Sequence, residues 1–141
     1  MPLAVFVWVM TTLLPQAAAP APVSVDFEFF RTRVQPIFLA KREGHARCVA
    51  CHAAGTPMLL QPLSPGATMW DEEQSRRNFE VVALRVTPGE MKSKLLVHPL
   101  EEEAGGDFFH SGGKHWSSQD DPEWQTFAAW VRGESAKASG R

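Results

Sequence analysis

Cys48, Cys51 and His52 are the residues of this chain whose types and spacing most clearly point to chemistry. They form the run Cys-Val-Ala-Cys-His, in which two residues separate the thiols and the imidazole directly follows the second thiol. On one helical turn this spacing allows each thiol to add to one vinyl group of a porphyrin. The adjacent imidazole can then bind the iron from the proximal side. The C-x-x-C-H pattern therefore predicts covalent attachment of one haem c.

Two other uses of the cysteines remain open at this point. They could form a disulfide or a redox-active pair, although such a pair normally follows an apolar strand in a βαβ unit. Here the preceding residues 41–47 are polar. They could also bind zinc, which needs four ligands. The chain has 2 cysteines, and the histidines spaced as a zinc pair, His110 and His115, follow far behind them in the sequence.

The size and charge of the chain suit a small carrier protein. Its 141 residues are enough for one domain, and its net charge of −2 does not favour nucleic acid as a partner. A core of this size is only marginally stable by itself, and a covalently held haem would give the helices a large apolar centre. The sequence shows no nucleophile–base pair, phosphate-binding loop or pair of catalytic carboxylates. We therefore expect an electron carrier and not an enzyme.

Residues 1–21 are typical of an export signal. The apolar run from Leu3 to Leu14 is shorter than the ~20 residues that span a bilayer, and the small residues 17–21 offer cleavage sites. No Lys or Arg precedes the run, so a buried or interfacial N-terminal segment is the alternative. We expect export to the periplasm or another extracytoplasmic compartment, a domain over residues 22–133, and a flexible tail over 134–141.

The first helix is expected to begin near Asp26. Phe27, Phe30 and Val34 recur at helical spacing and predict one apolar face, and Pro36 is expected to stop or kink the helix. The segment 53–69, rich in Gly and Pro, predicts a loop behind the C-x-x-C-H run. Within this loop we expect Leu59 and Leu60 to pack against the porphyrin.

Two further helices are marked by their caps. Asp71 and Gln74 are spaced as a capping box for a helix that extends to about Val86. Asp121 is followed by Pro122 at the first helical position, and Gly133 marks the end of this last helix.

Between these helices lies a stretch suited to close the second face of the haem. His110-Ser111-Gly112-Gly113 is followed by Lys114, His115 and Trp116, and adjacent glycines let a backbone run close to a flat surface. His110, His115, His98 and Met91 are the candidates for the second axial ligand.

The order of helix, C-x-x-C-H, helix, ligand loop and final helix resembles the class I cytochromes c. Their commonest members carry a Met ligand in the loop before the last helix, where this chain has none after Met91. The run His110–Gly113, followed by Asp121-Pro122-Glu123-Trp124, resembles instead the planctomycete-type cytochrome c domain, over about residues 26–133. This resemblance implies an all-α fold, a small cytochrome c-like domain with about four helices packed around one covalently bound haem. It also implies His52 as the proximal ligand and His110 as the distal ligand.

A haem iron with protein ligands on both faces has no open site for substrate, which suits electron transfer. We therefore expect an exported monohaem c-type cytochrome. Its partners would be a redox protein donor and acceptor, with a membrane-bound respiratory or photosynthetic complex among the candidates. The alternatives are a haem-based gas or redox sensor module and a fixed subunit of a larger membrane-associated redox complex.

Overall fold

Helices make up the regular structure of residues 22–137, which are the residues described in this computed structural model. Within this range no strand is formed, and one parallel bridge joins Leu100 to Trp116. The all-α prediction is confirmed at this level. The predicted export segment 1–21 lies outside the described residues, and so does the end of the predicted tail. No described helix is long and apolar enough to cross a membrane.

The first helix is continuous from α1 (Phe27–Phe29) through the π-helical turn η1 (Phe30–Val34) to α2 (Gln35–Leu39). Asp26 caps it, and its carboxylate accepts a hydrogen bond from the backbone N–H of Phe29 at 2.6 Å. The sequence predicted a stop or a kink at Pro36, but the helix does not stop there. A proline ring crowds the carbonyl four residues earlier, here that of Thr32. Thr32 lies in the wide π turn, which gives this ring room.

The two helices whose caps were predicted from the sequence begin at those caps. The C-x-x-C-H run forms α3 (Cys48–His52), and α4 (Glu72–Ala83) starts after Asp71, which shares a complete capping box with Gln74. Two short elements follow, α5 (Lys94–Val97) and the 3-10 turn η2 (Glu102–Ala104). The last helix, α6 (Pro122–Val131), is capped by the Asp121 carboxylate.

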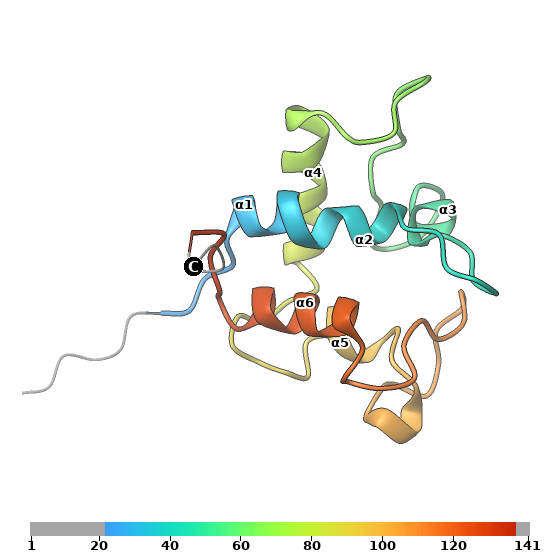
Figure 1. The fold of residues 1–141 in the computed structure, drawn as a ribbon, viewed down its shortest axis with the longest axis vertical. Helices are drawn as coiled ribbons and strands as arrows, with labels where there is room; N and C mark the ends of the chain where they lie inside the picture. Colours follow the sequence, from blue (N-terminus) through green and yellow to red (C-terminus); the bar gives the residue numbers. More distant parts are fainter. Residues whose placement is uncertain (1–21, 138–141) are drawn as a thin grey trace, which may run out of the picture.

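The core lies where the first helix, α4 and α6 meet. Figure 1 shows α1 and α2 running beside α6, with α4 crossing them. Phe30 is fully buried at this crossing, with ring centroids 5.3 Å from Trp130 and 5.6 Å from Phe79. Farther along, Phe38 packs on Phe127 at 5.4 Å. This packing brings the end of α2 to the middle of α6, and α3 lies beside α2 (Figure 1).

The two ends of the described chain lie together. The indole N–H of Trp130 donates to the Asp26 carbonyl at 2.8 Å, and the Asp26 carboxylate faces the backbone N–H of Ala136 at 3.5 Å. Gly133 has a φ of 86°, and an added Cβ there would meet the Val23 side chain at 2.8 Å. The N- and C-terminal segments therefore close one end of the helix packing, opposite the end that carries α3 (Figure 1).

Candidate cofactor site

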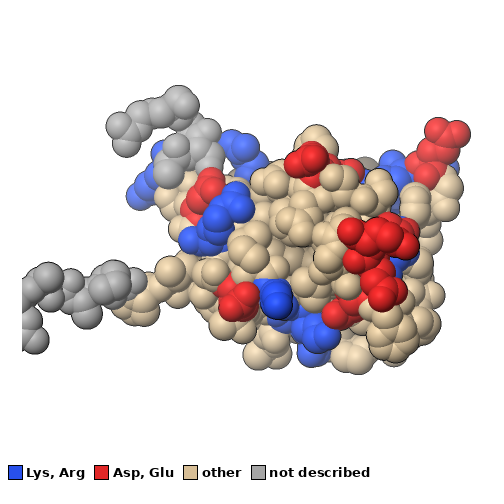
Figure 2. Space-filling view, turned by 90° about the horizontal axis from the view of Figure 1, so that it is seen from below, with Lys and Arg blue, Asp and Glu red and all other residues tan. Residues whose placement is uncertain are grey.

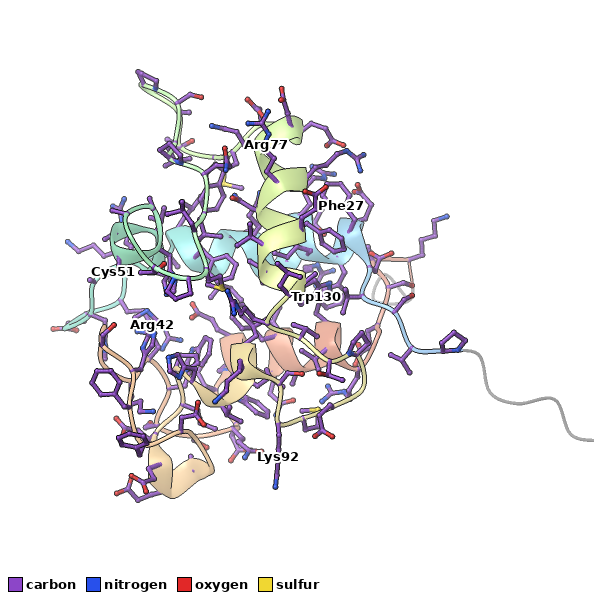
Figure 3. All side chains as sticks on the ribbon, turned by 180° about the vertical axis from the view of Figure 1, so that it is seen from behind. Phe27, Arg42, Cys51, Arg77, Lys92 and Trp130 are labelled. Carbon is purple, nitrogen blue, oxygen red and sulfur yellow. The ribbon has the colours of Figure 1, made fainter. Side chains whose placement is uncertain are left out.

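The two thiols lie on one turn of helix. Cys48 and Cys51 are both free, Cys48 half-buried and Cys51 exposed, so the structure does not form the disulfide considered from the sequence. Burial raises the pKa of the Cys48 thiol to about 11, which keeps this thiol protonated at neutral pH. Figure 3 shows Cys51 at the same end of the molecule as Arg42.

His52 is oriented by the loop that follows it. Its Nδ1 lies 3.0 Å from the Met58 carbonyl oxygen and 3.1 Å from the Thr56 hydroxyl, which itself donates to the same carbonyl at 3.0 Å. A carbonyl oxygen only accepts hydrogen bonds, so in the neutral imidazole Nδ1 carries the proton. The lone pair of Nε2 is then free to bind a metal.

The His110 ring is also held by a backbone carbonyl, which lies within hydrogen-bond distance of its Nδ1. A turn brings the Gly113 carbonyl to 2.6 Å from its Nδ1, and Gly113 adopts a φ of 79°, which glycine tolerates best. Burial lowers the pKa of His110 and outweighs the hydrogen bond to the Gly113 carbonyl, which acts in the opposite direction. His110 is therefore a neutral imidazole with Nδ1 engaged and Nε2 available.

The imidazole rings of His52 and His110 lie close and nearly parallel. Their centroids are 6.2 Å apart, and their planes differ by 18°. Two imidazoles that share one metal through bonds of about 2 Å, each with a nitrogen about 1 Å from its ring centre, have centroids roughly 6 Å apart. The separation of these two rings is thus that of two axial ligands on one metal ion.

Around these rings lies a cavity of about 350 Å³, within the size range of small-molecule and cofactor pockets. Much of its wall is apolar, from the side chains of Phe38, Met58, Leu95, Pro99, Trp116 and Phe127. Its charged lining residues are the cations Arg47, Arg85 and Lys94, and no Asp or Glu of the described chain lines it. Such a wall suits an apolar molecule that carries negative charge.

The expected porphyrin contacts of Leu59 and Leu60 are wrong. Leu59 is 47% exposed and Leu60 is buried in the protein core, and neither lines the cavity, which Met58 lines instead. The backbone N–H of Leu60 donates to the His52 carbonyl at 2.7 Å, which folds the loop back and turns Leu60 into the core.

The other candidate ligands fall into two groups. His98 and His115 line the cavity, whereas Met91 packs against the core outside it. His98 has its Nδ1 3.0 Å from the Asp107 carboxylate and its ring centroid 4.9 Å from that of His110. The structure therefore brings three of the four histidine and methionine candidates to one cavity.

His115 is a neutral group in an unusual setting. Burial, together with nearby His45 and Arg42, lowers its pKa from 6.5 to about 4. Its Nδ1 is buried and has no hydrogen-bond partner in the described structure. An orphaned buried polar atom on a cavity wall is costly unless a bound group satisfies it.

Three residues with roles at this site were missed by sequence reasoning. Thr56 supports His52, Arg85 supplies a cation to the cavity wall, and Arg42 ties the segment before α3 to the last helix through Glu123 at 2.6 Å. Thr56 follows His52 by four residues, a spacing that offers a hydroxyl to a neighbouring helical side chain. No comparable pattern distinguishes Arg42 or Arg85 from the other arginines.

Within residues 22–137, no group of three or more His, Cys, Asp or Glu side chains is placed to hold a bare metal ion. A zinc site would need four such ligands. A haem iron takes its equatorial ligands from the porphyrin, so two facing imidazoles are a sufficient protein set.

Comparisons with known proteins found no match to this chain: no family model matches it, and neither a curated protein nor a solved structure does.

Proposed function

We propose that this chain is an exported monohaem c-type cytochrome that transfers electrons between redox partners. The observation that carries this proposal is the placement of His52 and His110, whose ring centroids lie 6.2 Å apart in the chain that carries the two free thiols on α3. The two imidazoles would be the axial ligands, His52 from the proximal side and His110 from the distal side.

The residues present fit a haem. Each thiol, Cys48 and Cys51, would add across one vinyl double bond, with the sulfur binding one carbon and the thiol hydrogen going to the other. This addition needs no oxidant. The apolar cavity wall suits the porphyrin ring, and the cations among its lining residues suit the two carboxylates of a haem. The buried, unpartnered Nδ1 of His115 also points to a polar group of a bound molecule.

When bound, the haem supplies a one-electron change of oxidation state at its iron. The contribution of this chain is to fix both imidazoles through backbone carbonyls, so that little has to move when the charge changes. If His52 and His110 both held the iron, no position would be left for a substrate, which favours a carrier over an enzyme. Because imidazole is more basic than a thioether, we expect a lower reduction potential than in a His/Met cytochrome of equal burial.

We also propose that the helices form a cytochrome c-like fold around the haem. In the structure the first helix packs on α6, and α3 lies beside the end of α2. This arrangement supports a small cytochrome c-like domain in which about four helices enclose one covalently bound haem. The apolar segment near the N-terminus supports export, because haem is attached to C-x-x-C-H outside the cytoplasm in bacteria.

The test is an absorption spectrum of the protein purified from a host that matures c-type cytochromes. Denaturation in pyridine should report one haem per chain with both vinyl groups saturated. The native oxidised protein should be low-spin, without the charge-transfer band of a Met-sulfur ligand. A colourless protein with both thiols free would overturn the proposal, and a Met-sulfur band would overturn the role of His110.

A haem-based sensor is the second candidate, because of the way His110 is held. The one hydrogen bond described for its ring goes to a carbonyl three residues further on, and the preceding Phe108 and Phe109 are 85% and 57% exposed. A ligand on such a loop could leave the iron when a gas binds. Carbon monoxide binding to the reduced wild type would favour the sensor, and its absence would favour the carrier.

A further inference from the structure

The cavity favours a bound anion, because its charged lining residues are cations and no carboxylate of the described chain lines it. The chain has 16 Asp and Glu residues, and acidic side chains gather on its outer surface, as the face in Figure 2 shows. None of those in the described chain lines the cavity, where Arg47, Arg85 and Lys94 supply positive charge. Cations that face an apolar space without a carboxylate favour a bound anion.

The three cations differ in how far their charge is already compensated. Lys94 is paired with the Asp107 carboxylate at 2.8 Å. The Arg85 side chain has one hydrogen bond, from Nη2 to the Pro57 carbonyl at 2.6 Å, and this partner is uncharged. The side chain of Arg47 makes no hydrogen bond or ion pair in the described structure, and this residue is exposed. Arg85 and Arg47 are therefore the two cations free to meet an anion.

Arg47 and Arg85 would lie at different edges of a bound haem. The vinyl groups that cysteines capture lie on one edge of a haem, and the two propionates lie on the opposite edge. Arg47 directly precedes Cys48 and so belongs to the vinyl edge. Arg85 follows the end of α4, which Figure 1 shows toward the middle of the molecule and away from α3.

On the basis of the proposed function, we propose that Arg85 is the residue that binds a haem propionate. Its backbone is fixed by the N–H of Leu95, which donates to the Arg85 carbonyl at 3.1 Å. The bond to Pro57 holds one nitrogen of the guanidinium and leaves other N–H groups free. A guanidinium presents a planar fork that matches a carboxylate better than an ammonium does.

The same bond couples the carboxylate site to the proximal ligand. Pro57 lies between Thr56 and Met58, the two residues that hold Nδ1 of His52. Arg85 thus joins the propionate edge to the loop that orients the proximal imidazole.

The experiment compares the haem-loaded wild type with R85Q, R85K and, as a matched control, R47Q. R47Q removes the same charge from the same cavity at the cysteine edge. Resonance Raman spectra report the propionate bending mode, which responds to hydrogen bonds at the carboxylate, and a redox titration reports the potential. R85Q should shift this mode and lower the potential, because a cation that opposed the oxidised iron is lost. R85K should shift the mode but keep the potential close to wild type, and R47Q should leave the mode in place.

The outcomes separate this inference from the proposed function. If R85Q loads haem with an unmoved propionate mode, or if R47Q moves the mode as much as R85Q, the assignment to Arg85 is overturned while the cytochrome proposal stands. If R85Q fails to fold or to load, R85K decides: a shifted mode supports Arg85 and an unchanged mode overturns it. A wild type without haem overturns the proposed function and, with it, this inference.

Discussion

Arg42 and Glu123 form an ion pair, with 2.6 Å between Nη2 and Oε2, that joins the segment before α3 to the first turn of α6. Nη1 of Arg42 donates to the His115 carbonyl at 2.7 Å, and Cζ of Arg42 lies 5.8 Å from the centroid of the Trp116 ring. One side chain therefore connects the segment before the cysteine turn with His115 and Trp116, which line the cavity.

Replacing Arg42 by Ala should lower the free energy of unfolding of the holoprotein by about 2 kcal/mol, because partly buried charge-assisted hydrogen bonds are lost. The control is Arg77→Ala, which removes an exposed i,i+4 pair with Glu73, and which should cost at most about 0.5 kcal/mol. Denaturant unfolding followed by tryptophan fluorescence measures both values. Equal losses in the two variants would show that Arg42 is only a surface charge.

The helix starts were predictable from the sequence because a cap is a local device. Asp71 with Gln74, and Asp121 with Pro122, satisfy free backbone N–H groups within a few residues of themselves. The C-x-x-C-H run was likewise recognisable, since its two thiols and its imidazole need only one helical turn to act together.

The facing of His52 and His110 could not be derived from spacing, because it depends on packing between distant segments. His52 is the last residue of α3, whereas His110 follows η2, and the core contacts of the first helix with α6 bring the two regions together. The resemblance in the sequence suggested the pair, and the geometry supports it. The environment of Pro36 was missed for another reason: a π turn has no reliable sequence signal, although it lets the helix pass this proline.

The core around Phe30 gives a second prediction about stability. Phe30 is fully buried, and its ring centroid lies 5.3 Å from that of Trp130, where the first helix meets α6. Truncation to Ala should cost about 3–5 kcal/mol, since it leaves a cavity in the packed core. Leu84→Ala is the control, because Leu84 is 78% exposed, and it should change stability by less than about 0.5 kcal/mol. A loss below 1 kcal/mol, roughly the scale of a surface change, in F30A would contradict this description of the core.

The lowered pKa of His115 predicts how the stability of the haem-free chain depends on pH. Its pKa falls from 6.5 to about 4 on folding, so between these values the unfolded chain binds a proton that the folded chain does not. The unfolded state is then favoured as the pH falls, and stability decreases through this window. After allowance for solvent screening of a half-exposed group, we expect a loss of about 1 kcal/mol from pH 6.5 to 4. Urea unfolding of wild type and H115Q across this range tests it: an equally steep decrease in H115Q would assign the effect to other groups.

Replacing His110 by Ala, compared with replacing His98 by Ala, distinguishes the two imidazoles whose centroids lie 4.9 Å apart. His110 has its Nδ1 on a carbonyl and faces His52, whereas His98 has its Nδ1 on the Asp107 carboxylate. H110A should therefore lose the distal ligand and give a high-spin oxidised haem that binds added imidazole, while H98A should stay low-spin. Absorption and electron paramagnetic resonance spectra of the purified variants measure this difference. A low-spin H110A together with a high-spin H98A would make His98 the distal ligand, and two unchanged spectra would exclude both residues from the iron.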